Sequence, residues 1–62
     1  MTYRFRILDS SHHVLGVHFI ALDDDGQARG YVAGMLEKYD CARVEAWDGE
    51  RHVHSGEKGP LS

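Results

Sequence analysis

Two histidines near the C-terminal end of the chain have the spacing of a metal-binding pair. His52 and His54 lie two residues apart in a stretch that alternates like a β-strand, so their imidazoles are predicted to share one face. Such a pair can give two nitrogen ligands to one zinc or nickel ion, and His18 is the candidate for a third. Zinc sites normally need three or four positioned ligands, so ordinary polar histidines on a solvated sheet face are the commoner explanation. A metal site is therefore kept as an alternative hypothesis.

The single tryptophan is the second feature that could do chemistry. Trp47 is predicted on the sheet face opposite the core, with Arg4, Arg6 and Arg43 on the same side. A tryptophan in this setting can anchor a protein interface, stack on a nucleobase or pack against arginine stems on neighbouring strands. An interface anchor is the commonest functional use, and we expect it here.

The charge balance of the chain argues against a nucleic-acid partner. The formal net charge is −3 and the isoelectric point is about 5.9, so there is no basic excess to meet phosphates. The predicted open face also carries one aromatic residue instead of the two or three that RNA-binding sheets use. Single-stranded RNA binding through the open sheet face is therefore a lesser alternative.

The sequence offers no convincing catalytic constellation. Ser10 and Ser11 precede His12 and His13, but all four belong to a short predicted turn. A chain of 62 residues rarely encloses a cleft that excludes water. The acidic run at residues 23–25 lacks the ligand spacing of a calcium loop. We therefore do not expect an enzyme.

The N-terminal part of the chain predicts a β-hairpin. Residues 2–8 alternate with period two, with Tyr3, Phe5 and Ile7 on one face and Thr2, Arg4, Arg6 and Leu8 on the other, and residues 14–22 form a second apolar run after a turn-forming cluster. The short connection implies antiparallel pairing. In the second strand, the core face is predicted to carry Leu15, Val17, Phe19 and Ala21, and the other face Gly16, His18, Ile20 and Leu22.

A helix is predicted to follow Asp24. This residue can act as N-cap with Gln27 at the third helical position, close to a capping box. The helix is amphipathic, with apolar positions at Ala28, Tyr31, Val32, Met35, Leu36 and Tyr39. Gly30 and Gly34 weaken it but share one face, where they would let the helix approach a sheet or another helix closely.

A second hairpin is predicted around Asp48 and Gly49. Asp-Gly between two alternating runs favours a type I′ turn, in which both residues have positive φ. This turn would pair Trp47 with Glu50, Ala46 with Arg51, Glu45 with His52, Val44 with Val53 and Arg43 with His54.

Together these elements predict a single α+β domain of ββαββ order over residues 1–55. We expect a four-stranded antiparallel sheet in the order 2-1-3-4, with the helix crossing the first strand and packed on one face. Residues 56–62 are predicted to be a frayed tail. The predicted core consists of Tyr3, Phe5, Ile7, Leu15, Val17, Phe19, Val44 and Val53 from the sheet against Ala28, Tyr31, Val32, Met35 and Leu36 from the helix.

The chain resembles a set of very short bacterial proteins of unknown function. The likeness rests on a Tyr-Arg-Phe start at residues 3–5, the Asp24-Asp25 pair and the Val-Glu-Ala-Trp-Asp-Gly-Glu-Arg run at residues 44–51. It covers roughly residues 2–54. The resemblance implies a strand-strand-helix-strand-strand unit, and it brings no activity with it. The glycines of the helix and the abundance of histidine depart from the pattern.

The size of the domain favours self-association. A core this small is marginal on its own, and Cys41 is the only cysteine, so disulfides cannot supplement it. A lone thiol suits a reducing, cytoplasmic setting, and neither a signal peptide nor a membrane-spanning run is evident. We expect a homodimer, and an unidentified protein partner is the alternative. The interface residues predicted for it are Trp47, Arg4, Arg6, Arg43 and Ile20.

Overall fold

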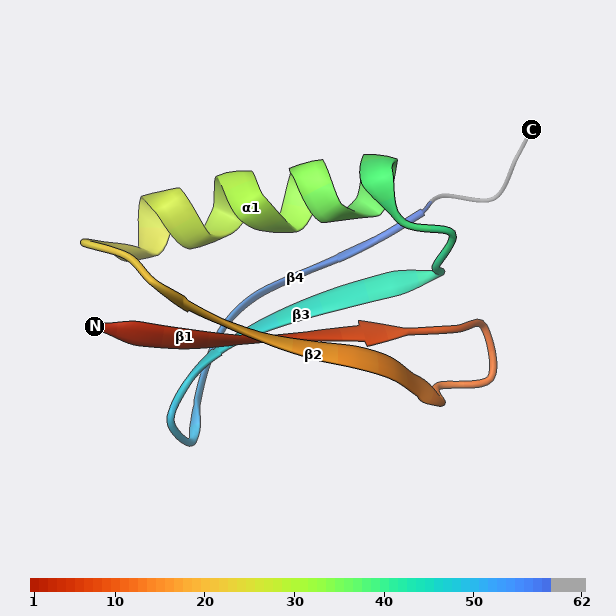
Figure 1. The fold of residues 1–62 in the computed structure, drawn as a ribbon, viewed down its shortest axis with the longest axis horizontal. Coiled ribbons are helices and arrows are strands. Elements are labelled where there is room, and N and C mark those ends of the chain that lie inside the picture. The colour runs from red at the N-terminus through yellow and green to blue at the C-terminus, as the bar shows by residue number, and fades with distance from the viewer. Residues whose placement is uncertain (59–62) are drawn as a thin grey trace.

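The computed structural model describes residues 1–58 and has the predicted α+β architecture. Two hairpins flank the helix, and their strands form one antiparallel sheet in the order β2-β1-β3-β4 (Figure 1). The fold class, element order and sheet order predicted above are therefore confirmed. The elements are β1 (Thr2–Leu8), β2 (Val14–Ala21), α1 (Asp25–Lys38), β3 (Arg43–Asp48) and β4 (Arg51–Glu57).

The C-terminal strand is longer than predicted. β4 extends to Glu57, and the Lys58 backbone N–H then donates to the Ala42 carbonyl at 3.0 Å. The boundary predicted after residue 55 is thus two residues too early for the strand. The rest of the predicted tail, residues 59–62, lies outside the described residues.

The start of α1 is capped as the sequence predicts. The Asp24 side chain accepts a hydrogen bond from the Gln27 backbone N–H at 2.9 Å. The Gln27 side chain in turn accepts from the backbone N–H of Asp23, one residue before the cap, at 2.9 Å. This reciprocal pair satisfies donors that an α-helix leaves free at its first turn.

The helix lies nearest to β3 and β4 and also covers buried side chains of β1, since the Phe5 ring centre lies 5.9 Å from that of Tyr31 and Tyr3 bonds to Asp25. In Figure 1, α1 lies above the sheet with β4 passing beneath it. The buried face of α1 consists of Ala28, Val32 and Met35. The buried core joins these to Tyr3, Phe5, Ile7, Leu22, Cys41, Val44 and Ala46.

The face assignment predicted for β2 is wrong. Cross-strand partners in a sheet share a face. Ile20 lies opposite Tyr3 and His18 opposite Phe5, so these β2 residues face the helix side. Phe19 lies opposite Arg4, on the open side of the sheet. Val17 lies opposite Arg6 and shares the open side with Phe19, whereas Leu15 is the extra residue at a register shift and has no partner on β1. All three are exposed, whereas we expected them in the core.

The register predicted for the second hairpin is also wrong. Gly49 has a φ of 63°, while Asp48 has a negative φ and pairs with Arg51. The central turn residues are therefore Gly49 and Glu50, and glycine at the first of them is the pattern of a type II′ turn. A β-bulge follows, because Trp47 pairs with His52 and Ala46 with His54, leaving Val53 as the extra residue.

No helix within residues 1–58 is long and apolar enough to cross a membrane.

Candidate interaction surface

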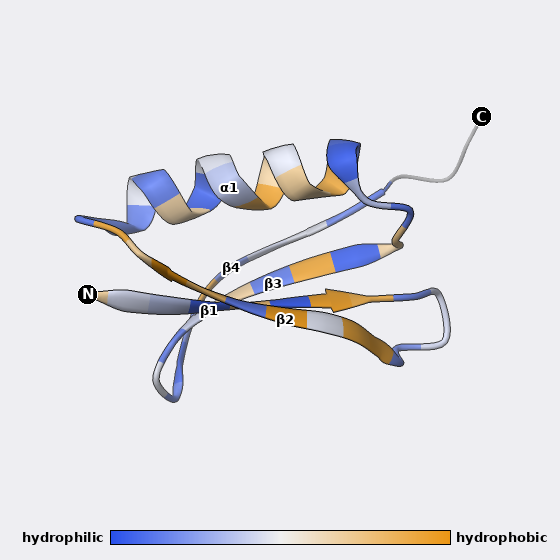
Figure 2. Ribbon diagram, viewed as in Figure 1, coloured by the Kyte–Doolittle hydropathy of each residue, from blue (hydrophilic) through white to orange (hydrophobic). Residues whose placement is uncertain are grey.

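The open face of β2 is an apolar strip with nothing packed against it. Phe19 is 70% exposed, Leu15 55% and Val17 43%, whereas the core side chains Phe5 and Val44 are completely buried. In Figure 2 the hydrophobic colour runs along much of β2, at the border of the sheet. Large apolar side chains gathered on one strand in this way are typical of a contact surface. We call Leu15, Val17 and Phe19 the β2 strip.

The other face of β2 borders a groove of about 710 Å³ between the strand and the helix. It exists because α1 lies nearest to β3 and β4 and leaves the helix side of β2 only partly covered. The His18 ring stacks on Tyr39 with 5.7 Å between centroids, and the Lys38 ammonium lies 5.5 Å from the Tyr39 ring centre. The main lining residues are His18, Ile20, Leu22, Tyr31, Met35 and Tyr39.

Gly30 and Gly34 also line this groove. A methyl group at either position would meet nothing within 4 Å. The predicted close approach of the helix to a sheet or a second helix is therefore not made within the described chain. These glycines leave the groove wide and leave backbone of the helix open to whatever enters it.

The outer edge of β2 presents unpaired backbone groups. Met1 and Leu22 exchange both backbone hydrogen bonds, at 2.8 and 3.2 Å. In an antiparallel ladder such pairs alternate with pairs whose N–H and C=O point away from the neighbouring strand. By this alternation Gly16, His18 and Ile20 bond to β1. The N–H and C=O groups of Val17, Phe19 and Ala21 point outward.

The opposite edge of the sheet is protected against pairing. β4 carries Arg51, His52, His54 and Glu57, and the bulge at Val53 interrupts its ladder near the middle. Charges and bulges are the usual ways to keep an edge strand from pairing with another chain. β2 has no Asp, Glu, Lys or Arg between Val14 and Ala21. The two edges therefore differ in their readiness to accept a strand.

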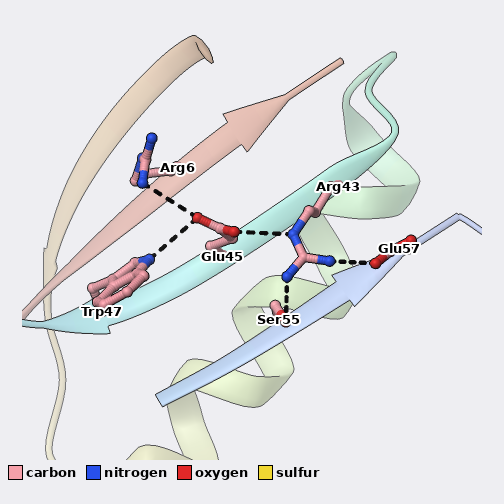
Figure 3. A network of polar contacts seen from close by, with 6 residues as sticks. All are labelled: Arg6, Arg43, Glu45, Trp47, Ser55 and Glu57. Carbon is pink, nitrogen blue, oxygen red and sulfur yellow. Dashed lines mark hydrogen bonds and ion pairs between the residues drawn. The ribbon is translucent and has the colours of Figure 1, made fainter. Parts of the chain in front are cut away.

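The rest of the open face is covered by a polar network centred on Glu45 (Figure 3). The carboxylate of Glu45 accepts from Arg43 Nε at 3.0 Å and from Trp47 Nε1 at 3.3 Å, and lies 3.4 Å from Arg6 Nη1. Arg43 also reaches Ser55 Oγ at 3.1 Å and pairs with Glu57. Partial burial acts to raise the pKa of Glu45, but the hydrogen bonds from Arg43 and Trp47 outweigh it and leave the pKa lowered.

Arg4 differs from the other arginines of this face. Its guanidinium lies 5.8 Å from the Trp47 ring centre, and its strand partners are Phe19 and Trp47. Within residues 1–58 it has no carboxylate partner, and its Nε is buried without a hydrogen bond. Trp47 also meets the His52 ring edge-on at 5.0 Å. One row of side chains, Phe19-Arg4-Trp47-His52, thus crosses the whole sheet.

The structure gathers four of the five predicted interface residues. Arg4, Arg6, Arg43 and Trp47 share the open face, as the alternation of β1 and β3 indicates. Ile20 lies on the helix side and borders the groove. Sequence reasoning missed the β2 strip because β2 is apolar on both faces. The one available signal was that Arg4 and Arg6 had to share a face with their partners on β2.

The three histidines proposed as metal ligands are not brought together. His52 lies on the open face beside Trp47, whereas His54 is the partner of buried Ala46 on the helix side. The bulge at Val53 is the reason, since it breaks the two-residue alternation between them. His18 lies on β2, at the opposite border of the sheet. Within the part of the chain that the structure describes, no three His, Cys, Asp or Glu residues cluster around a metal position.

Comparison of the chain with protein-family models, with curated proteins and with solved structures gave no match.

Proposed function

We propose that this protein is a non-catalytic interaction module that forms a homodimer through β2. The observation that carries the proposal is that β2 is unpartnered at its outer edge and on its open face and only partly covered on its helix side. Its open face exposes the β2 strip, its helix face borders the groove, and its outer edge has unpaired backbone groups. An edge strand of this length and composition pairs with another strand or becomes an aggregation site.

The energetics favour burial of this strand. Each Å² of apolar surface removed from water is worth roughly 25 cal/mol. In a two-fold pair of β2 strands, strip residues of one copy lie beside strip residues of the other along the seam, so each lateral contact is made twice. Because a domain of this size is only marginally stable alone, this contribution is large relative to its own stability.

A second copy of the chain suits β2 better than a charged partner. The strand has no Asp, Glu, Lys or Arg, so pairing with itself places no like charges of these types opposite each other. Of the three arginines on the open face, Arg6 and Arg43 are already paired with Glu45, which leaves Arg4 beside Trp47 to meet a phosphate. One such cation on an acidic chain is weak support for the alternative of RNA binding.

The first test is the molar mass of the protein in solution, measured by light scattering after size exclusion over a wide concentration range. We expect a dimer that dissociates when Phe19→Asp places a charge in the β2 strip. Phe19 is mostly exposed in the subunit, so this variant keeps the fold, which circular dichroism checks. His52→Asp, in the same cross-strand row at the other edge, is the matched control and stays dimeric.

Two results would count against this interface. A parent protein that is monomeric at every concentration removes the homodimer altogether. A dimer that survives Phe19→Asp but dissociates on Trp47→Ala moves the contact to the centre of the open face, where Trp47 and Arg4 lie.

A further inference from the structure

We propose that the two copies of β2 pair antiparallel about a two-fold axis, so that the His12-His13 end of one subunit lies beside the Asp23-Asp24 end of its partner. This inference rests on the proposed homodimer and adds the orientation of the subunits and the charges that select it. It rests on the outward-pointing backbone N–H and C=O groups of β2 and on the residues at the two ends of the strand.

The backbone of β2 can pair with an identical strand. The outward N–H and C=O groups belong to Val17, Phe19 and Ala21, as the exchange between Met1 and Leu22 fixes. Antiparallel pairing lets these residues exchange hydrogen bonds with the same set in the other copy. The result is one continuous eight-stranded sheet with both helices on the same side.

Symmetry restricts the register further. Directly opposite residues share a face, so a helix-side residue of β2 must face a helix-side residue of the other copy. This holds only when the two-fold axis lies between the two copies of one residue, so that this residue faces its own counterpart. An axis level with the gap between two consecutive residues would pair opposite faces. The middle of β2 lies between Val17 and His18, so an axis at one of these two residues gives the longest overlap.

The ends of β2 have opposite chemistry. His12 and His13 precede the strand, and the aspartates at residues 23–25 follow it. β2 has an extra residue at Leu15 relative to β1, so the register near His13 is counted along the chain and holds to about one residue. An axis at His18 brings His13 near the partner's Asp23, and an axis at Val17 brings it near the partner's Ala21, two residues away. Parallel pairing would instead place histidines beside histidines and aspartates beside aspartates. The match of imidazole donors with carboxylate acceptors therefore favours the antiparallel dimer.

The charged groups already in contact with these ends identify the pair available to the partner. His13 Nδ1 lies 3.4 Å from Asp9 Oδ2 and is itself exposed. Asp24 caps α1, and Asp25 is held by Tyr3 and Arg51. Within residues 1–58 no hydrogen bond or ion pair engages the carboxylate of Asp23, whose backbone N–H alone is bonded. His13 and Asp23 are thus the residues to substitute in a test of the orientation.

The test uses two variants that are poor homodimers but good partners for each other. His13→Asp places like charges at both ends of its own dimer, whereas Asp23→Lys removes the carboxylate acceptor and sets lysine beside the donor-bearing imidazole at both ends. A mixed dimer has one introduced Asp-Lys pair and one native end, so its charges agree at both ends. We expect each variant alone to have a dimer dissociation constant raised roughly two- to fivefold per end, because exposed pairs are weak. Native mass spectrometry of the mixture then shows mixed dimers in excess of a 1:2:1 statistical distribution.

A matched control and a cross-link make the outcome decisive. His52→Asp and Glu50→Lys introduce the same charges at the far edge, so their mixture stays statistical. In a Cys41→Ser background, cysteine at position 17 or 18 forms an intersubunit disulfide only on the axis, because only there do identical residues meet at bonding distance. A dimer that is sensitive to Phe19→Asp yet shows statistical mixing and no disulfide at either position overturns the orientation and leaves the homodimer standing. A monomeric parent overturns both.

Discussion

At the residue scale, a cluster around Asp25 ties the first strand, the helix and the second hairpin together. The Tyr3 hydroxyl donates to Asp25 at 2.6 Å, and Arg51 donates to both oxygens of this carboxylate at 3.1 Å. Arg51 also donates to Asp48 at 3.1 Å. The hydrogen bonds from Arg51, and then from Tyr3, lower the pKa of Asp25 to about 2. The bond to Asp25, together with burial, raises the pKa of Tyr3 to about 12.

These two shifts predict how stability depends on pH. Asp25 has a depressed pKa, so its contribution is present above the ordinary aspartate pKa of about 4 and is lost as the pH falls through about 2. Tyr3 has a raised pKa, so its contribution is present below about pH 10 and is lost as the pH rises through about 12. The measurement is the free energy of unfolding by urea across the pH range. Tyr3→Phe is expected to remove the alkaline decline that Tyr3 causes. Tyr31→Phe, at an exposed tyrosine, leaves it in place; an unchanged alkaline slope in Tyr3→Phe would contradict the assignment.

Sequence reasoning at this scale succeeded where strict alternation links neighbouring residues. Arg4 and Arg6 alternate with large apolar residues on β1, so their common face with Trp47 could be predicted. The partners of Asp25 could not, because Tyr3 and Arg51 are more than 20 residues away on either side. Their meeting depends on how the helix lies on the sheet.

At the element scale, the errors came from β2 and from the turn of the second hairpin. Both faces of β2 are apolar, so the alternation does not tell which face the helix covers. The pairing with β1 decides it. Tyr3 and Phe5 are buried under the helix, and their cross-strand partners Ile20 and His18 must lie on the same face. In the second hairpin, glycine at the first central turn position satisfies one positive φ, and the bulge at Val53 then corrects the register. A bulge within a strand leaves no local mark in the sequence.

The glycines of α1 and β4 give a prediction at the same scale. Gly30→Ala and Gly34→Ala add a methyl group in open space, so each is expected to stabilise the subunit by about 0.5–1 kcal/mol through helix propensity. Gly56→Ala is expected to destabilise it, because the new methyl would lie 2.8 Å from Leu36 Cδ1 and 3.0 Å from Val32 Cγ1. Chemical denaturation of the three variants at one protein concentration measures both effects. Equal changes of the same sign at Gly34 and Gly56 would contradict the packing of α1 against β4.

At the scale of the whole molecule, assembly and stability are linked. A partner that binds only the folded state stabilises it by mass action, and here the partner is a second copy. We therefore expect the melting temperature of the parent protein to rise with protein concentration. The melting temperature of Phe19→Asp is expected to be independent of concentration. Differential scanning calorimetry over a hundredfold range of concentration tests this. A parent melting temperature that does not move would count against a dimer of native subunits.

The position of Trp47 also gives the protein an optical probe of its own. It is the single tryptophan of the chain, and it contacts Arg4 on β1 and His52 on β4 while hydrogen-bonded to Glu45 on β3. Its emission therefore senses the seams between β1, β3 and β4, which separate only when the subunit unfolds. The free edge of β2 lies beyond β1 from it. Fluorescence thus follows the fold while light scattering follows the assembly, and the two processes can be read separately in one unlabelled sample.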